Sequence, residues 1–312
     1  MYLKLEIWLR VIRFKFLAAS AIAVTNGLAL SYWYQPNHFN IFYALLTYLG
    51  IFCLHASVDL FNDYWDFKRG IDLITKKTKF SGGTGVLPEG LLKPDEVFRA
   101  GILFLILGLS IGISFVFVKG YVIALILGFA TLSILLYSGK LVNVGLGELF
   151  VGTKGAMIVI GSFYVQTSLI MLEPIIVGVI TGLLSSLVLY INSIPDIIAD
   201  KEKGRKTLAI ILDNHSPSKI FTFVLGLFIM IYFLTFVFYY FVIDYIYSFI
   251  ICLFLMPLTM FILYKFYIFL FYYKIIDSFY EKVMEKTILF SRLYGFSIVM
   301  GILIIFIKNY KK

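Results

Sequence analysis

The chain has 312 residues, of which 61% are hydrophobic and only 14% are charged, and its mean hydropathy is +0.95. Soluble domains carry about 25% charged residues, so this composition excludes an ordinary soluble protein and indicates a polytopic membrane protein with a single domain. The two cysteines lie inside apolar segments, which excludes a disulfide or zinc framework. The net charge of +9 could suggest a nucleic-acid partner, but membrane topology explains it better, so no nucleic acid is expected.

Long apolar segments follow one another along the chain. A helix that crosses a membrane needs about 20 mostly apolar residues. We therefore expect an all-α protein, one domain over 1–312, with nine transmembrane helices at roughly 14–34, 40–62, 96–118, 121–138, 145–170, 174–195, 218–240, 246–270 and 287–307. Strands are not expected, because the apolar runs are too long and do not alternate.

The basic residues favour one orientation of these spans. If each Lys or Arg is assigned to the nearer end of its span and the N-terminus is cytoplasmic, 23 of the 27 lie on the cytoplasmic side. This bias is typical of membrane proteins. We therefore expect a multi-pass protein of the cell (plasma) membrane with a cytoplasmic N-terminus. The longest polar stretches, 63–95 and 196–217, would form cytoplasmic cap loops.

The second expected helix ends in a cluster of acidic and amide side chains. Asn62, Asp63 and Asp66 lie at its end, and Asp72 follows in the polar stretch. Acidic residues beside hydrocarbon are costly, so such a cluster indicates a functional site. Carboxylate oxygens are ligands that Mg²⁺ prefers, and Mg²⁺ in turn binds phosphorylated substrates.

Two polar residues continue the same helix face deeper into the membrane. Asp59 and His55 are spaced i, i+4 with each other. They could form a helical pair that merely satisfies itself, or they could line a polar pocket that runs down from the metal site. The sequence leaves both interpretations open.

The polar stretch that follows contains Ser81-Gly82-Gly83-Thr84-Gly85, after lysines at 76, 77 and 79. A glycine-rich backbone with lysines nearby can bind phosphate oxygens through its amide groups. The alternative is a flexible loop tip.

The sixth expected helix ends in a second copy of the acidic pattern. Asn192, Asp196 and Asp200 are spaced i, i+4, i+8, which places them on one helical face, and Pro195 is expected to bend that helix. Both copies fall on the cytoplasmic side. We therefore interpret them as two halves of a single metal–diphosphate site.

These residues resemble the UbiA superfamily of intramembrane aromatic prenyltransferases, which have nine transmembrane helices and aspartate-rich motifs after helices 2 and 6. The first motif is similar to the menaquinone-branch pattern N-D-x-x-D-x-x-K/R-G-x-D, at Asn62, Asp63, Asp66, Arg69, Gly70 and Asp72. The second is similar at Asn192, Asp196, Asp200, Gly204, Lys206 and Thr207, but Pro195 stands where that branch often has Arg. Two more elements resemble the family in the loop after helix 4: Tyr137-x-x-Lys140 and Gly145-Leu146-Gly147-Glu148.

The resemblance implies Mg²⁺-dependent transfer of a prenyl chain from a polyprenyl diphosphate to an aromatic quinone precursor similar to 1,4-dihydroxy-2-naphthoate, within the lipid bilayer. It implies two Mg²⁺ ions with ligands from Asn62, Asp66, Asn192, Asp196 and Asp200, and a catalytic set of Asp63, Asp66, Asp72, Asp196 and Asp200. Candidates for binding the diphosphate are Lys79, Tyr137, Lys140, Arg205 and Lys206. Candidates for the acceptor pocket are His55, Asp59 and Arg13.

Two alternatives stay open. The first is a lipid enzyme of the archaeal digeranylgeranylglyceryl phosphate synthase type, whose glycerol-phosphate acceptor would need the extra cations that the loop lysines could provide. The second, more remote, is a secondary transporter, because transporters also place acidic residues in the membrane. The acidic motifs here are expected at the membrane surface rather than at its midplane, which argues against transport.

Overall fold

The computed structural model describes residues 2–75, 77–136, 144–213, 216–242, 245–273 and 278–310. Over these ranges the chain forms helices and their connections without any strand, which confirms the all-α expectation. The long helices are α2 (Leu17–Tyr34), α3 (Ile41–Lys68), α4 (Pro94–Lys119), α5 (Tyr121–Leu136), α6 (Gly147–Thr167), α7 (Leu172–Ser193), α10 (Pro217–Phe241), α11 (Tyr245–Ile268) and α12 (Ser278–Tyr310). The short helices are α1 (Tyr2–Val11), α8 (Ile197–Glu202) and α9 (Leu208–Asp213).

Eight helices in the described ranges are long and apolar enough to cross a membrane. The remaining expected span, 121–138, corresponds to α5, which has 16 residues and is shorter than the roughly 20 that a span needs. The expected count of nine is therefore one too high by this measure. The difference arises because the expected span continued past Leu136, where the described part of α5 ends.

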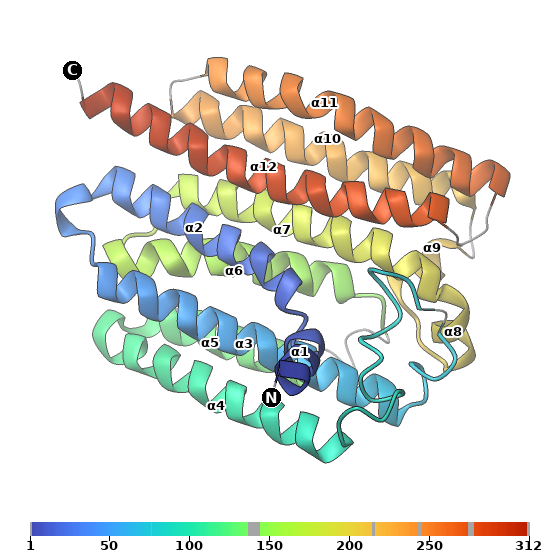
Figure 1. Ribbon diagram of the computed structural model, residues 1–312. Helices are drawn as coiled ribbons and strands as arrows, with labels where there is room; N and C mark the ends of the chain where they lie inside the picture. The colour runs from blue at the N-terminus through green and yellow to red at the C-terminus, as the bar shows by residue number, and fades with distance from the viewer. Residues whose placement is uncertain are drawn as a thin grey trace.

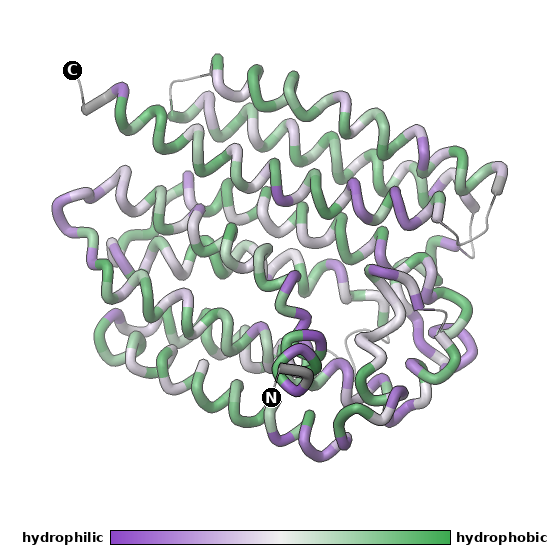
Figure 2. The backbone as a smooth tube through the Cα atoms, viewed as in Figure 1, coloured by the Kyte–Doolittle hydropathy of each residue, from purple (hydrophilic) through white to green (hydrophobic). Residues whose placement is uncertain are grey.

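The long helices lie side by side in one bundle (Figure 1). Helices α10, α11 and α12 form one side, α4 and α5 form the opposite side, and α2, α3, α6 and α7 lie between them. The connection from α3 to α4, together with α8 and α9, gathers at one end of the bundle. Hydrophobic residues follow the long helices, while hydrophilic residues concentrate at the ends and in these connections (Figure 2).

Helices α6 and α7 approach each other closely through small residues. A Cβ atom on Gly182 of α7 would collide with the Gly152 carbonyl oxygen of α6, and a Cβ on Gly178 would lie 2.9 Å from the Ala156 carbonyl oxygen. Small residues at such spacing let membrane helices pack backbone to backbone. This packing fixes α7, and hence the second acidic motif, relative to α6.

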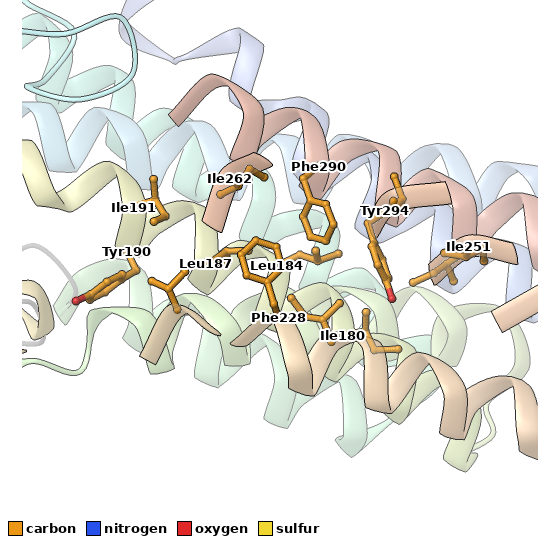
Figure 3. Packing of buried hydrophobic residues seen from close by; sticks show 14 of the residues in the cluster. Ile180, Leu184, Leu187, Tyr190, Ile191, Phe228, Ile251, Ile262, Phe290 and Tyr294 are labelled. Atoms are coloured by element: carbon orange, nitrogen blue, oxygen red, sulfur yellow. The ribbon is translucent and has the colours of Figure 1, made fainter. Parts of the chain in front are cut away.

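A large hydrophobic core lies among α7, α10, α11 and α12 (Figure 3). Leu184 and Leu187 of α7 face Phe228 of α10 and Phe290 of α12, and all four side chains are almost fully buried. The buried hydroxyl of Tyr294 donates a hydrogen bond to Thr235 Oγ1 over 2.8 Å, so this hydroxyl is satisfied. The half of the bundle away from α3 is thus tightly packed, and the cavity described next lies on the other side of α7.

Candidate active site

A cavity of about 320 Å³ lies between α2, α3, α6, α7 and the connection from α3 to α4. Both acidic motifs open onto it. The first supplies Asn62 and Asp66 from α3 and Asp72 from the connection. The second supplies three residues from the end of α7 through α8: Asn192, Asp196 and Asp200. The structure therefore brings the two acidic motifs together around one cavity.

Pro195 shapes the backbone of the second acidic motif. It occupies a single 3-10 turn, Ile194–Asp196, between α7 and α8. This turn interrupts the helix without ending it, so Asn192, Asp196 and Asp200 still line the same cavity. The bend expected at Pro195 coincides with this change from α-helix to 3-10 helix.

Arg205 joins the two acidic motifs. One nitrogen of its guanidinium, Nη2, forms an ion pair with Asp66 Oδ1, and the other, Nη1, lies 3.1 Å from Asp200 Oδ1. The side chain of Arg205 is only 9% exposed. Burial alone lowers the pKa of Arg205, but the two carboxylates outweigh that effect and raise its pKa above the usual value. Arg205 is therefore a permanent cation between carboxylates at the mouth of the cavity.

Asp72 lies under the glycine-rich segment. A Cβ atom on Gly83 would lie 2.6 Å from Asp72 Oδ1, and the φ of Gly83 is +72°, so only glycine lets the backbone approach the carboxylate here. Burial, supported by the neighbouring Asp66 and Asp63, raises the pKa of Asp72 to about 7. Gly82 and Gly83 also line the cavity, so the glycine-rich segment is folded against the site rather than extended into solvent.

Asp63 does not line the cavity. It is fully buried, and its carboxylate accepts hydrogen bonds from the Thr84 hydroxyl and from the Thr84 backbone amide, the latter over 3.3 Å. Arg13 Nη2 lies 3.3 Å from Asp63 Oδ1. Asp63 thus holds the glycine-rich segment and Arg13 in place, and Arg13 itself lines the cavity in a left-handed backbone conformation with φ of 49°.

The site residues offer oxygen atoms that suit a hard cation. Three buried oxygen atoms of the two acidic motifs line the cavity without a hydrogen-bond partner among the described residues: Asp72 Oδ2, Asn192 Oδ1 and Asp196 Oδ1. Mg²⁺ binds such oxygens, usually together with water and substrate phosphates. Over the same ranges, no three His, Cys, Asp or Glu side chains are already gathered as a metal cluster. The donor set therefore fits Mg²⁺ that is shared with a phosphorylated substrate.

The deep end of the cavity contains His55 and Asp59. His55 Nε2 lies 3.6 Å from Asp59 Oδ2, and His55 Nδ1 shares a hydrogen bond of 2.6 Å with Ser20 Oγ of α2. Both residues line the cavity. The two interpretations that the sequence left open are therefore both realised, because the residues pair with each other and also line a polar pocket.

Some expected diphosphate ligands lie elsewhere. Lys79 is exposed, with Nζ 5.5 Å from the centre of the Phe80 ring, and Lys206 is exposed as well; neither lines the cavity. Tyr137 and Lys140 lie outside the described residues.

Sequence reasoning missed three charged residues that line the cavity: Lys154 and Glu148 of α6, and Arg292 of α12. Glu148 was noted only as part of a family motif. The signal for Lys154 was available, because a lysine inside an apolar span is costly and hence a candidate functional residue. Arg292 also lies inside an expected span, but its Nη2 atom donates a hydrogen bond to the Lys15 carbonyl oxygen, so it has a partner within the protein.

A second pocket, of about 90 Å³, lies between α3, α4, α5 and α6 and is lined almost entirely by apolar side chains. Lys154 and Ile158 line both this pocket and the polar cavity. The two spaces therefore adjoin at one turn of α6.

Sequence comparisons agree with this geometry. A family model described as the UbiA prenyltransferase family matches residues 22–276. A 1,4-dihydroxy-2-naphthoate octaprenyltransferase of Bacillus subtilis is 30% identical over 203 residues, 64% of this chain and 63% of the relative, so the match spans somewhat less than two thirds of that relative. The enzyme of the same name from Escherichia coli is 30% identical over 215 residues, 66% of this chain and 68% of the relative. The resemblance to the menaquinone branch is therefore confirmed.

Solved structures share the fold. A digeranylgeranylglyceryl phosphate synthase has a TM-score of 0.64 at 19% identity, with 96% of this chain and 98% of that chain covered. A UbiA homologue from Archaeoglobus fulgidus bound to DMAPP and Mg²⁺ has a TM-score of 0.58 at 16% identity, with 94% of this chain and 99% of that chain covered. At these identities the likeness establishes the arrangement of the helices.

Proposed function

Because the chain belongs to the UbiA prenyltransferase family, we propose that it transfers a prenyl chain from a prenyl diphosphate to a small aromatic acceptor within the membrane. The observation that carries this proposal is the meeting of two acidic motifs around one cavity, with Arg205 between Asp66 and Asp200. The favoured acceptor is similar to 1,4-dihydroxy-2-naphthoate, which two bacterial relatives carry in their names. The Gly70-x-Asp72 ending of the first motif supports the same choice.

The diphosphate would bind where the acidic motifs meet. Residues with oxygen donors there would hold Mg²⁺, which when bound neutralises the diphosphate and assists its departure: Asn62, Asp66, Asp72, Asn192, Asp196 and Asp200. A structural relative bound to DMAPP and Mg²⁺ supports the use of this cofactor. We propose two ions, because two separate motifs contribute ligands.

The chain's own groups complete the diphosphate site. Arg205 can donate charge-assisted hydrogen bonds to phosphate oxygens once its carboxylate partners turn to the metal. The backbone of Gly82 and Gly83 lines the same part of the cavity and can add amide donors. These donors stabilise the charge that develops on the leaving group when its bond to the prenyl C1 carbon breaks.

The remaining steps concern the allylic cation. A carbon of the electron-rich acceptor ring forms a bond to C1 of the prenyl group, and the ring then loses a proton to a nearby base. The adjoining apolar pocket between α3, α4, α5 and α6 can shield the prenyl chain from water. Asp59 lines the polar cavity together with Lys154, which also borders that apolar pocket.

Substitution of one carboxylate from each motif tests the proposal. Asp66→Asn and Asp196→Asn should each lower turnover of labelled geranylgeranyl diphosphate by about 100-fold or more, because each removes a metal ligand without changing shape. EDTA should silence the wild-type enzyme, and added Mg²⁺ should restore it. Lys203→Gln, at an exposed position outside the cavity, is the matched control. Near-normal turnover in either Asn variant, or activity that persists in chelator, would refute the metal–diphosphate site.

A glycerol-phosphate acceptor remains the second candidate. The observation in its favour is that three cations line the cavity besides Arg205, namely Arg13, Lys154 and Arg292. An assay that supplies labelled geranylgeranyl diphosphate with each acceptor in turn distinguishes the two candidate acceptors. Turnover with geranylgeranylglyceryl phosphate alone would replace the quinone-precursor proposal.

The distribution of basic residues supports a cytoplasmic site in the cell (plasma) membrane. The connection from α3 to α4 and helix α8, which carry Asp72 and Asp200, lie at the end of the bundle where hydrophilic residues concentrate (Figures 1 and 2). We therefore propose that the N-terminus and the diphosphate site face the cytoplasm.

A further inference from the structure

Lys154 is a basic residue inside a membrane-spanning helix. It lies on α6 and forms no hydrogen bond or ion pair with any residue in the described part of the chain. Long lysine side chains near helix ends can reach the membrane surface, but Lys154 points into the polar cavity and borders the apolar pocket. A charge kept at this depth without a partner implies that a ligand supplies one.

The opposite wall offers the complementary group. Asp59 of α3 lines the same cavity as Lys154, and no ion pair joins the two in the described part of the chain. The Oδ2 atom of Asp59 is buried and has no hydrogen-bond partner among the described residues. Asp59 and Lys154 thus line one cavity from two helices, and each can still form a polar contact with a ligand. A ligand that fits between them carries an anionic group for Lys154 and a hydroxyl donor for Asp59.

This pair lies away from the diphosphate end. Asp59 precedes Asp66 by seven residues on α3, and Lys154 follows Glu148 by six residues on α6. At 1.5 Å of rise per residue, these separations are about 10 Å and about 9 Å along the helices. The separation between Asp59 and Asp66 leaves room for an aromatic ring beneath a diphosphate held by Asp66, Asp196 and Asp200.

We propose that Lys154 is the residue that selects the acceptor, by binding the carboxylate of a hydroxylated aromatic acid while Asp59 accepts a hydrogen bond from a ring hydroxyl. This inference rests on the proposed function and names the substrate class at its acceptor end. A buried charge that is satisfied only by the correct substrate discriminates strongly against an analogue lacking the matching group. His55 and Ser20 position Asp59 from behind through their mutual hydrogen bond and the His55–Asp59 contact.

The experiment compares 1,4-dihydroxy-2-naphthoate with 1,4-dihydroxynaphthalene, which lacks the carboxylate, and varies the acceptor and geranylgeranyl diphosphate in turn. The wild-type protein should prefer the acid by about 100-fold in kcat/KM, the size expected for one charge-assisted contact in a buried site. Lys154→Met should remove this preference by raising the KM for the acid, while the KM for the diphosphate stays unchanged. Lys154→Arg should retain most of the preference. Thr153→Ala, whose hydroxyl bonds only its own helix, is the neighbouring control and should behave as wild type.

The outcomes separate this inference from the proposed function. A wild-type protein that turns over both naphthalene acceptors equally well would overturn the role of Lys154 and leave prenyl transfer intact. A Lys154→Met variant with a raised KM for the diphosphate would overturn it as well, by assigning Lys154 to the leaving group. Failure of the wild-type protein to prenylate any aromatic acceptor would overturn the proposed function itself. If Lys154→Met does not fold, the Lys154→Arg variant and the two-acceptor comparison in wild type still decide the question.

Discussion

At the scale of single residues, Arg205 connects features that lie far apart in the sequence. It binds Asp66, 139 positions away, and Asp200, five positions away, through two nitrogens of one guanidinium. A planar guanidinium can contact two carboxylates through two of its nitrogens, whereas a lysine ammonium is a single point charge. Without Mg²⁺ or substrate, Arg205 therefore keeps two buried carboxylates from repelling each other. When the substrate binds, the Arg205 guanidinium can contact the phosphate oxygens instead.

Substitution of Arg205 should therefore act on the diphosphate more than on the acceptor. Arg205→Lys should raise the KM for the prenyl diphosphate about tenfold, because one of two charge-assisted contacts is lost. The KM for the aromatic acceptor should stay within about twofold of wild type, since the deep end of the cavity is untouched. Steady-state kinetics in membranes with each substrate varied in turn would measure both values. A change confined to the acceptor KM would contradict this role.

The sequence predicted the placement of some site residues correctly and missed that of others. Spacing of i, i+4 correctly grouped Asn62 with Asp66, and Asn192 with Asp196, because a helix places such residues on one face. Asp63 follows Asn62 by one residue and is rotated by about 100°, so it points to Thr84 and Arg13 instead of the cavity. The motif gives the residue types but not which face of the helix is turned to the cavity. The orientation of Asp63 therefore becomes clear only once its neighbours are known. Lys154 was missed because a single lysine in an apolar run belongs to no motif.

At the scale of elements, α1 is tied to the connection between α3 and α4 by a small charge cluster. Arg10 of α1 donates to both carboxylate oxygens of Glu89, over 2.9 and 2.6 Å, and its Nε atom donates to the Thr84 carbonyl oxygen over 2.8 Å. Lys77 Nζ lies 2.9 Å from Glu89 Oε1. These cations lower the pKa of Glu89 to about 2, so the cluster persists at all pH values near neutrality. Thr84 is the residue that also binds Asp63, so the cluster positions the glycine-rich segment at the cavity mouth.

Reversal of this ion pair tests that positioning. Arg10→Glu and Glu89→Arg should each raise the KM for the prenyl diphosphate by about two- to fivefold, because a pair that is about 40% exposed contributes modestly. The double swap should restore much of the loss, since it re-forms the pair with reversed charges. Lys286→Glu, which disrupts a separate surface pair with Glu285, is the matched control. Equal losses in the single and double variants would contradict a role for this ion pair.

The sequence could not predict this element-level arrangement. Segment 81–85 was compatible with either a phosphate-binding loop or a flexible tip, because glycine content is the same in both. The structure folds it over the cavity through contacts with residues more than 70 positions earlier in the chain. Such long-range ion pairs leave no local pattern in the sequence.

At the scale of the whole molecule, hydropathy predicted the bundle well because the membrane imposes a simple rule on composition. Eight expected spans correspond to helices of sufficient length in the described ranges, and only α5 falls short. Hydropathy could not predict which helices pack together. That depends on close approach at Gly178 and Gly182 and on the shape of the core between α7, α10 and α12.

The orientation of the bundle is the remaining prediction at this scale. Helix α8 lies at one end of the bundle (Figure 1), and the exposed residue Lys203 follows it directly, whereas the connection from α6 to α7, which carries the exposed residue Ile170, lies at the other end. In a background with Cys53→Ala and Cys252→Ala, a membrane-impermeant maleimide should label Ile170→Cys in intact cells. It should label Lys203→Cys only after the membrane is opened, because the positive-inside bias places that end in the cytoplasm. The reverse pattern would place the diphosphate site outside the cell, where the basic connections would face the wrong side for a positive-inside protein.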